Sequence, residues 1–352
     1  MRREQPVRRP APTPNCAVVL LPEWLYFRAM NARRTRNLAR RAREVAPCPI
    51  VSVGNLTTGG TGKTPTVQWL ARVVQSESRR VGAVARGYRG TKSDAGALVS
   101  DGTTTFLSAR EAGDEAVLHA RNLPGCVVAI GADRHRAVEL AVEAGANVVV
   151  LDDGFGFWSL PRAFDLVLLD AKAPFGNGRL LPMGRLREEP AALARADAVL
   201  LTRADRASAD ELEHSRALVR EWTDALVFEA SHAPLDWRDE RTGEPLPLSA
   251  LANRRVRAFA GLADNAQFYT LVRQLTGQEV TLPARERGDH YAWQERDFVG
   301  WSGESVVVTT EKDAVKCDPN WFAGPLWSLR IALRLRGDEE ALVKLVLKHL
   351  SL

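Results

Sequence analysis

Cysteine is scarce in this 352-residue sequence, and the four that occur are widely separated: Cys16, Cys48, Cys126 and Cys317. They form no C-x-x-C pair and no spacing typical of metal ligands. This distribution argues against a disulfide framework and against a structural zinc site. It predicts reduced thiols in a cytosolic protein.

The sequence also lacks a hydrophobic run that could cross a bilayer, which takes about 20 consecutive apolar residues. The apolar patch at 17–30 is interrupted by Pro22, Glu23 and Arg28, and no small-residue cleavage site of a signal peptide follows it. Lysine is missing from the first 50 residues, yet their eleven arginines give this stretch a net charge of +8, against +5 for the whole chain. Such a basic end indicates contact with an anionic surface. A nucleic-acid enzyme would more often spread its basic patch over the catalytic body.

Residues 1–45 are therefore interpreted as a basic amphipathic segment that associates with a membrane surface. Residues 1–15 are rich in proline and arginine, and we expect them to be disordered. Beyond them, apolar side chains are expected to enter the membrane interface while arginines face anionic headgroups. The two sets are Leu20, Leu21, Trp24, Leu25 and Phe27, and Arg33, Arg34, Arg36, Arg40, Arg41 and Arg43. The alternative is an ordinary amphipathic helix packed on the protein body.

The rest of the composition is typical of a globular protein, with 45% hydrophobic and 26% charged residues, and the length favours two domains. Short apolar runs alternate with helical patterns, such as the one at 133–144, and this alternation predicts βαβ units. We therefore expect an α/β fold with a doubly wound, mainly parallel sheet like that of P-loop NTPases. The strands predicted for the first domain lie at 50–53, 81–85, 127–130, 148–151, 166–169 and 199–201.

Changes in pattern set the predicted domain boundaries. Residues 46–230 form the first domain, 231–250 a polar, proline-rich linker with a turn at 241–243, and 251–352 a smaller α/β domain. The smaller domain is expected to contain strands at 256–260, 280–282, 306–309 and 327–335 and helices at 265–275 and 338–350.

A glycine-rich loop follows the first predicted strand and is the most specific local signal. Three glycines precede a Lys-Thr pair, and Pro65 then begins a helix. Exposed backbone amides, the helix dipole and a lysine charge suit a triphosphate. The predicted nucleotide-binding residues are Thr57, Thr58, Gly59, Gly60, Thr61, Gly62, Lys63 and Thr64. The strict P-loop pattern has glycine where Thr57 stands, and the alternative is a turn that merely joins a strand to a helix.

Carboxylates supply candidate metal ligands and a candidate base. Asp152 and Asp153 end a buried strand, and with Thr64 they are predicted to hold Mg²⁺ beside the phosphates, although a polar turn is the alternative. Asp114 and Glu115 begin a helix. They are either ordinary first-turn residues or, respectively, a base that deprotonates a hydroxyl group and a neighbour of Mg²⁺. The residues alone leave that choice open.

Several other charged residues have two readings. Arg86 follows a strand and Arg134 opens a helix, and both either hold phosphoryl charge or form surface salt bridges. Arg187 lies in a long loop after a strand, and loops of this kind usually bind a ligand. His290 stands alone in a loop of the smaller domain, where a structural role is the more common one. The stretch at 310–313 is explained as a helix cap with its threonine as the N-cap residue.

In order, these motifs resemble the tetraacyldisaccharide 4′-kinases of lipid A synthesis, and the resemblance runs from about Leu20 to the C-terminus. The motifs that carry it are Gly54-Asn55-Leu56-Thr57, Gly59-Gly60-Thr61-Gly62-Lys63-Thr64-Pro65, Arg86-Gly87-Tyr88, Gly113-Asp114-Glu115, Asp133-Arg134, Asp152-Asp153-Gly154-Phe155, Phe175-Gly176-Asn177-Gly178, Leu186-Arg187-Glu188, Asp289-His290 and Thr310-Glu311-Lys312-Asp313.

The resemblance implies a peripheral kinase at the cytoplasmic face of the inner membrane. It would move the γ-phosphate of ATP, with Mg²⁺, to the 4′-hydroxyl of a lipid A disaccharide 1-phosphate precursor. It implies that Asp114 and His290 form a catalytic pair and that Lys63 offsets phosphate charge. The predicted phosphate or substrate contacts are Arg86, Arg134 and Arg187. No nucleic acid and no protein partner is expected.

One motif departs from the family pattern, and two other functional classes stay open. The family usually continues its double-aspartate motif with Gln-His, where this chain has Gly156-Phe157, and we expect altered substrate contacts there. A P-loop ATPase switch, or a membrane-associated NTPase regulated by partners, would share the nucleotide loop but need no base for a sugar hydroxyl. A non-catalytic membrane-binding descendant would keep the fold and lose turnover.

Overall fold

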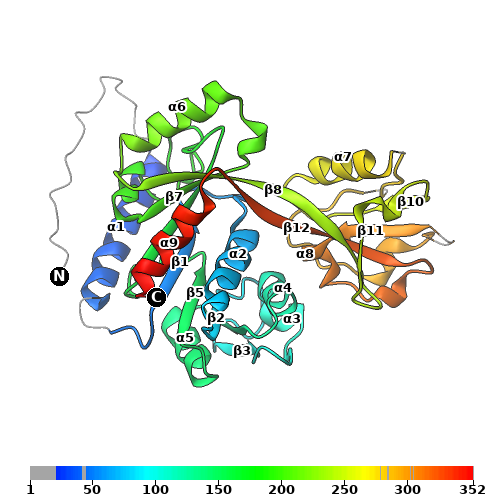
Figure 1. Ribbon diagram of the computed structural model, residues 1–352, viewed down its shortest axis with the longest axis horizontal. Coiled ribbons are helices and arrows are strands. Elements are labelled where there is room, and N and C mark those ends of the chain that lie inside the picture. Colours follow the sequence, from blue (N-terminus) through cyan, green and yellow to red (C-terminus); the bar gives the residue numbers. More distant parts are fainter. Residues whose placement is uncertain are drawn as a thin grey trace.

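The computed structural model describes residues 21–41, 45–277, 279–283, 285–301, 303 and 305–351. The predicted disorder at 1–15 and the side chains of Leu20 and Arg43 lie outside these residues. Figure 1 shows a large lobe around strands β1–β7 and a small lobe around β9–β11, joined by the long strands β8 and β12.

The bounds of the helices and strands are as follows. The strands are β1 (Ile50–Asn55), β2 (Val81–Ala85), β3 (Ala97–Ser100), β4 (Val127–Ile130), β5 (Val148–Asp152), β6 (Phe164–Asp170), β7 (Ala198–Thr202), β8 (Leu226–Asp239), β9 (Pro245–Leu246), β10 (Val256–Ala258), β11 (Val306–Thr310) and β12 (Leu326–Arg336). The helices are α1 (Leu21–Arg41), α2 (Lys63–Ser76), α3 (Ala109–Ala112), α4 (Asp114–Asn122), α5 (Arg134–Glu143), α6 (Ala209–Arg220), α7 (Asn265–Thr276), α8 (Glu311–Ala314) and α9 (Glu339–Leu350).

Within the described residues, twelve strands form one sheet in the order β10-β11-β12-β8-β7-β6-β1-β5-β2-β4-β3, with β9 paired to β8. The ladders from β7 through β4 are parallel, and β3 pairs antiparallel with β4. Strand β12 pairs antiparallel with β8 and parallel with β11. The expected mainly parallel sheet is confirmed. Strands β1 and β5 are buried along their whole length, because a parallel sheet is covered on both faces.

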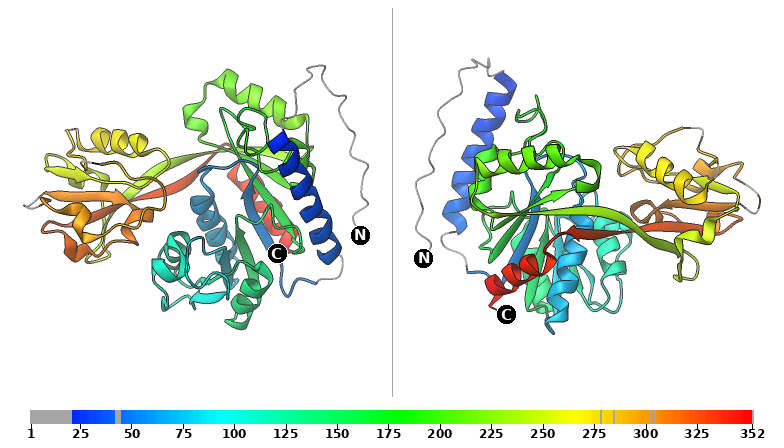
Figure 2. Two further views of the ribbon diagram at one scale, coloured as in Figure 1. Left: turned by 180° about the vertical axis from the view of Figure 1, so that it is seen from behind. Right: turned by 45° about the horizontal axis from the view of Figure 1, so that its top comes forward.

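Helices cover both faces of the large-lobe sheet, as Figure 2 shows from two further sides. On one face, Val51 and Val53 of β1 share a hydrophobic cluster with residues of α2, α4 and α9. On the other, Ile50 packs in a cluster with residues of α5, and a neighbouring cluster contains residues of α6. This layering leaves the carboxyl ends of β1 and β5 side by side, because Val53 pairs with Asp152 in the parallel ladder.

Strands β8 and β12 form a two-stranded ribbon that connects the lobes (Figure 1). They pair antiparallel from Glu229 opposite Arg336 to Asp239 opposite Trp327, with an irregularity between Arg330 and Ile331. The predicted linker at 231–250 is therefore wrong in its first half, which is regular strand to Asp239. Most β8 side chains are only partly buried, so the ribbon has neither a continuous apolar run nor a clean alternation.

Two other predictions need correction, the start of one helix and the presence of one strand. The helix after the glycine-rich loop begins at Lys63, two residues before Pro65. The predicted strand at 280–282 is absent from the described residues, where Thr281 forms a single bridge with Arg257. Pro283, which has no N–H to donate, follows this bridge and prevents a longer ladder.

Helix α9 returns to the large lobe, where Leu342, Val346 and Leu350 join the cluster that holds α2. The small lobe has its own clusters, which include Phe259 and Trp327. The division into domains at 46–230 and 251–352 stays a proposal, and this packing places the last helix with the core of the large lobe.

Candidate active site

The glycine-rich loop is held between β1 and α2 by contacts on both sides. Thr58 N donates to Arg185 O at 2.7 Å, and Asn55 Nδ2 donates to Thr61 Oγ1 at 3.0 Å. Gly59 and Gly62 adopt φ values of 113° and 80°, which side chains with a Cβ rarely adopt. The loop is thus fixed in a shape that glycine permits, at the N-terminal end of α2, where backbone amides and the helix dipole favour an anion.

His232 of β8 lies directly behind this loop. A Cβ atom added to Gly62 would stand 2.0 Å from His232 Nε2, so the imidazole ring packs against the glycine backbone. Burial, followed by the charge of Arg203, lowers the pKa of His232 to about 4. Arg203 itself donates to Gly60 O and to Asp170 Oδ2, the latter at 2.9 Å. The ribbon strand and the end of β7 therefore both support the nucleotide loop.

The charged side chains of Lys63, Asp153 and Arg187 are clustered beside the glycine-rich loop. Lys63 Nζ lies 3.7 Å from Asp153 Oδ1, and Arg187 Nη1 donates to both oxygens of Asp153 at 2.9 and 2.8 Å. Burial alone would raise the pKa of Asp153, but the charges of Lys63 and Arg187 hold it below its ordinary value. Sequence prediction placed Asp153 beside a metal, and the structure pairs it with these two cations.

Asp152 is buried and has a histidine partner. His119 Nε2 lies 3.0 Å from Asp152 Oδ2, and both side chains are almost completely enclosed. Asp152 Oδ1 has no hydrogen-bond partner among the described atoms. Burial, followed by the charge of Asp152, raises the pKa of Glu115. An enclosed carboxylate with a free oxygen beside a second acid, and Thr64 in the first turn of α2, are a donor set that suits Mg²⁺.

A dedicated metal cage is not visible. Among the residues that the structure describes, no three His, Cys, Asp or Glu side chains are grouped so that they could hold a metal ion. Mg²⁺ at nucleotide sites is usually held by one or two carboxylates together with phosphate oxygens and waters. The donor set around Asp152 therefore fits a metal that arrives with a nucleotide.

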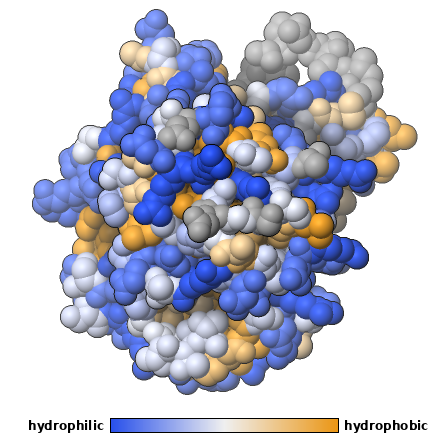
Figure 3. All heavy atoms as spheres, turned by 90° about the vertical axis from the view of Figure 1, so that its right-hand side faces the viewer, coloured by the Kyte–Doolittle hydropathy of each residue, from blue (hydrophilic) through white to orange (hydrophobic). Residues whose placement is uncertain are grey.

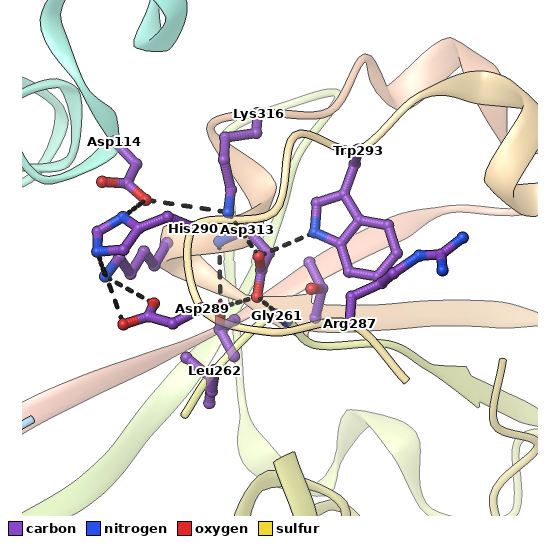
Figure 4. A network of polar contacts seen from close by, with 12 residues as sticks. Asp114, Gly261, Leu262, Arg287, Asp289, His290, Trp293, Asp313 and Lys316 are labelled. Atoms are coloured by element: carbon purple, nitrogen blue, oxygen red, sulfur yellow. Dashed lines mark hydrogen bonds and ion pairs between the residues drawn. The ribbon is translucent and has the colours of Figure 1, made fainter. Parts of the chain in front are cut away.

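The predicted catalytic pair is in direct contact across the two lobes (Figure 4). Asp114, at the start of α4, has its Oδ2 atom 3.0 Å from Nδ1 of His290 in the small lobe. Asp114 Oδ1 accepts from Glu115 N at 2.9 Å. Burial alone would raise the pKa of Asp114, but the hydrogen bond from His290 and the charges of Lys312 and Lys316 lower it. Asp114 is thus an ionised, oriented carboxylate.

His290 is held by its backbone as well as by its ring. Its φ of 60° lies in the left-handed region, which is unusual for a residue with a side chain. Arg89 Nη1 donates to His290 O at 3.0 Å, and the ring of Tyr88 makes an edge contact with the imidazole. Nearby, Asp313 accepts from Gly261 N and from Trp293 Nε1, each at 2.9 Å, which fixes the small-lobe loops around the histidine (Figure 4).

The three predicted substrate arginines differ in placement. Arg187 is bound to Asp153 as described, and Arg86 is exposed at the end of β2. Arg134 is buried, donates to Gly131 O at 2.9 Å and lies over the ring of Phe157, and burial lowers its pKa to about 10. Phe157, which stands where the family usually has histidine, thus contacts one of the arginines that we had predicted to bind the substrate.

Helix α1 has one face on the protein and one face away from it. Phe27 packs against the cluster near Leu186, and Tyr26 Oη donates to Arg187 O at 3.0 Å. Glu23 accepts from Arg179 at 2.9 Å. Phe27 was predicted to enter a membrane, and this was wrong because it packs on the large lobe. On the other face, large side chains are 44 to 66% exposed: Leu21, Trp24 and Leu25.

The described part of the chain contains no helix of the length and hydrophobicity needed to cross a membrane. On the small-lobe face in Figure 3, hydrophilic residues dominate and hydrophobic residues occupy several separate areas.

Sequence reasoning missed three side chains near the site. Lys312 and Lys316 lie beside the Asp114–His290 pair, and His119 supports Asp152. The cap predicted for Thr310 is present, since its hydroxyl accepts from Asp313 N at 3.1 Å. From the sequence, this cap explained the whole motif at 310–313. The motif lies at the carboxyl end of β11, however, and that position could have drawn attention to Lys312. His119 lies on the inner face of a helix and gave no separate signal.

Comparison with known proteins identifies the family. The sequence profile described as tetraacyldisaccharide-1-P 4′-kinase matches residues 16–351. The tetraacyldisaccharide 4′-kinase of Anaeromyxobacter dehalogenans (strain 2CP-C) is 45% identical over 327 residues, which cover 90% of this chain and 84% of that protein. The enzyme of the same name from Geobacter metallireducens is 41% identical over 279 residues, covering 77% and 79% of the two chains.

A solved structure agrees with this result. The crystal structure of LpxK from Aquifex aeolicus in complex with ATP has a TM-score of 0.76 and 30% identity, and the match covers 94% of this chain and 98% of that one. The P-loop NTPase-like fold and the resemblance found in the sequence motifs are thereby confirmed. From its sequence profile, its relatives and its fold, the chain belongs to the tetraacyldisaccharide-1-P 4′-kinase family.

Proposed function

We propose that this kinase transfers the γ-phosphate of ATP to the 4′-hydroxyl of a lipid-linked glucosamine disaccharide 1-phosphate, the precursor of lipid A. The observation that carries the proposal is the 3.0 Å contact between Asp114 of the large lobe and His290 of the small lobe. A partner-regulated ATPase switch has no need for such a pair. The A. aeolicus relative, crystallised with ATP, supports ATP as the phosphate donor.

In this mechanism Asp114 is the general base. Its carboxylate takes the proton of the 4′-hydroxyl as the sugar oxygen attacks the γ-phosphorus, and the bond from that phosphorus to the bridging oxygen of ADP breaks. His290 Nδ1 lies 3.0 Å from Asp114 Oδ2, and this contact orients the base. A positioned general base contributes about 10²- to 10⁴-fold to the rate of such a step.

The nucleotide loop stabilises the charge that moves during transfer. The amides between Thr57 and Thr64, with the dipole of α2, would face the phosphates, and Lys63 would leave its 3.7 Å contact with Asp153 to reach them. Because Arg187 also binds Asp153, that carboxylate keeps a partner when Lys63 moves. Arg86 and Arg134, together with Arg187, are the proposed contacts for phosphate or substrate.

Mg²⁺ is part of the proposal. Thr64, Asp152 and Glu115 would hold it, with Asp153 behind them. Asp152 Oδ1 is enclosed without a hydrogen-bond partner in the described structure, and the charge of Asp152 raises the pKa of Glu115. When bound, Mg²⁺ supplies positive charge to the phosphate oxygens. His119 keeps Asp152 Oδ2 engaged, so Oδ1 is the oxygen left for the metal.

We also propose that the enzyme works as a peripheral protein at the cytoplasmic face of the inner membrane. The exposed side chains of Leu21, Trp24 and Leu25 would enter the interface, and the arginines that follow on α1 would meet anionic headgroups. The same helix contacts the loop that carries Arg187, so membrane contact and the phosphate site are adjacent. The lipid substrate is the proposed partner, without nucleic acid or a protein partner.

The test is transfer of labelled phosphate from ATP to a tetraacyl disaccharide 1-phosphate in mixed micelles. The wild type should label the lipid, and Asp114→Asn should lose about 10²- to 10⁴-fold in kcat while binding ATP normally. Lys63→Met should weaken ATP binding as well as turnover. ATP hydrolysis without lipid labelling in the wild type would favour the switch, and no turnover with a folded, ATP-binding protein would favour a non-catalytic descendant.

A further inference from the structure

Lys312 of α8 and Lys316, two residues after the end of that helix, lie against the catalytic pair, and the mechanism above uses neither. Lys312 Nζ lies 3.2 Å from His290 Nε2, 3.1 Å from Asp289 Oδ1 and 3.6 Å from Glu115 Oε1. Lys316, about one turn later, lies 3.9 Å from Asp114 Oδ2 (Figure 4). The far nitrogen of the imidazole therefore faces an ammonium group, and its near nitrogen faces a carboxylate.

Hydrogen-bond chemistry then restricts the state of the ring. A lysine ammonium group only donates and an ionised carboxylate only accepts. A neutral His290 satisfies both contacts only when Nε2 carries no hydrogen and Nδ1–H donates to Asp114 Oδ2. The opposite tautomer would set an N–H against the ammonium of Lys312 and a lone pair against the carboxylate, so both contacts would be repulsive.

We propose that Lys312 is a positioning residue that holds His290 in the neutral tautomer protonated at Nδ1, so that His290 in turn orients the carboxylate of Asp114. The catalytic consequence rests on the kinase function proposed above. The tautomer itself is a property of the resting protein and can be measured without substrate.

Lys312 is well placed to act in this way. Its side chain is only 19% exposed. Burial alone would lower the pKa of Lys312, but Asp114, Glu115 and Asp289 raise it above its ordinary value, so the group is charged at neutral pH. The Thr310 cap fixes the start of α8, and the neighbouring Glu311 accepts from Asn122 of α4 at 2.6 Å. The ammonium is thus anchored to both lobes.

The competing state is a protonated ring. In that case Nε2–H would donate toward Asp289 Oδ2, which lies 3.6 Å away, and the imidazolium would face the ammonium of Lys312 at 3.2 Å. Like charges at that distance repel strongly in a partly buried site. The two states predict different nitrogen resonances, so they can be told apart directly.

The experiment is ¹⁵N NMR of the full-length protein with labelled histidine, without nucleotide or lipid. The chain has six histidines, and His290→Gln identifies the signals of interest. In the wild type we expect a protonated Nδ1 and an unprotonated Nε2. Lys312→Met should replace this pattern by a ring that carries a hydrogen on both nitrogens, because Asp114 still accepts from Nδ1–H while no ammonium opposes a proton on Nε2. Lys312→Arg, which keeps a donor and a charge, should restore the wild-type pattern. Lys344→Met, at an exposed lysine paired with Glu340, is the matched control.

Kinetics supply the second readout. Lys312→Met should lower kcat about 10- to 100-fold, less than the 10²- to 10⁴-fold expected for loss of the general base itself, with little change in the KM for ATP or lipid. Lys312→Arg should recover most of the loss. An unchanged His290 spectrum in a folded Lys312→Met variant, or an imidazolium or Nε2–H form in the wild type, would overturn the inference. If the wild type shows the expected tautomer but labels no lipid, the proposed function fails and the assigned tautomer stands.

Discussion

Substitution of Gly62 by alanine tests how tightly the nucleotide loop and the inter-lobe ribbon are fitted to each other. Gly62 has φ 80°, and its missing Cβ leaves the space that the ring of His232 occupies. An alanine there meets two separate costs. The left-handed backbone costs about 1–2 kcal/mol for a residue with a Cβ. Moving a buried ring out of a packed interior costs about a further 1–3 kcal/mol.

The magnitude of the second cost comes from the geometry. A Cβ on Gly62 would stand 2.0 Å from Nε2 and 2.1 Å from Cε1 of His232, well inside van der Waals contact, so the ring or the loop has to shift. Gly243 provides a matched control, because its φ is 77° and nothing lies within 4 Å of its missing Cβ. Gly243→Ala should therefore lose only the backbone cost, about 1–2 kcal/mol.

The assay is urea unfolding of the two variants and the wild type, followed by ATP titration calorimetry. Gly62→Ala should lose about 2–5 kcal/mol of unfolding free energy, the sum of the two costs. Its Kd for ATP should rise about tenfold or more, because a loop displacement worth 1.4 kcal/mol is already a factor of ten. Gly243→Ala should bind ATP like the wild type.

A double-mutant cycle isolates the contact. In a His232→Ala background the ring is gone, so Gly62→Ala should cost only the backbone part, with a coupling energy of about 1–3 kcal/mol. Equal losses for Gly62→Ala and Gly243→Ala would refute the reasoning. So would a Gly62→Ala cost that is the same in both backgrounds, because the loop would then not be packed against the ribbon.

Three further predictions concern charge and surface. Because burial lowers the pKa of His232 from 6.5 to about 4, the unfolded chain takes up its proton first as the pH falls. Stability should thus drop by up to about 3 kcal/mol between pH 7 and 4, and urea unfolding of a folded His232→Leu variant should lack that part of the pH dependence. Replacing Trp24 and Leu25 by serine should weaken co-sedimentation of the protein with anionic vesicles, and added salt should weaken it too. Equal vesicle binding by the wild type and this variant would contradict the membrane role. Arg187→Met should leave Asp153 paired with Lys63 alone, so ATP binding should weaken because Lys63 is held back, and an unchanged Kd by calorimetry would contradict this.

The local elements could be predicted from sequence because each is determined by neighbouring residues. The runs at β2 and β4 match the predicted strands at both ends. An apolar run, three glycines and a Lys-Thr pair were enough to locate the loop between β1 and α2, and in the structure Gly59 and Gly62 of this loop adopt positive φ. Such signals need no knowledge of the rest of the chain.

The ribbon could not be predicted in the same way. The polar, proline-containing stretch of β8 was interpreted as a linker, since its side chains are partly exposed on both faces and give no clear period. It becomes a strand only because β12, almost a hundred positions later, supplies the hydrogen bonds of the ladder. Likewise, the inward direction of Phe27 depends on the cluster around Leu186, which α1 meets only in the folded protein.

Sequence by itself determined the phosphate loop, the strands that flank it and, through ordered motifs, the family. The family resemblance implied that Asp114 and His290, 176 positions apart, form a pair, but only the tertiary structure decided which of their atoms meet and that Lys312 stands behind the histidine. The physical reason is that spacing along the chain determines helices, strands and turns, whereas contact between distant side chains depends on the pairing of β8 with β12 and on the packing of α8 against α4.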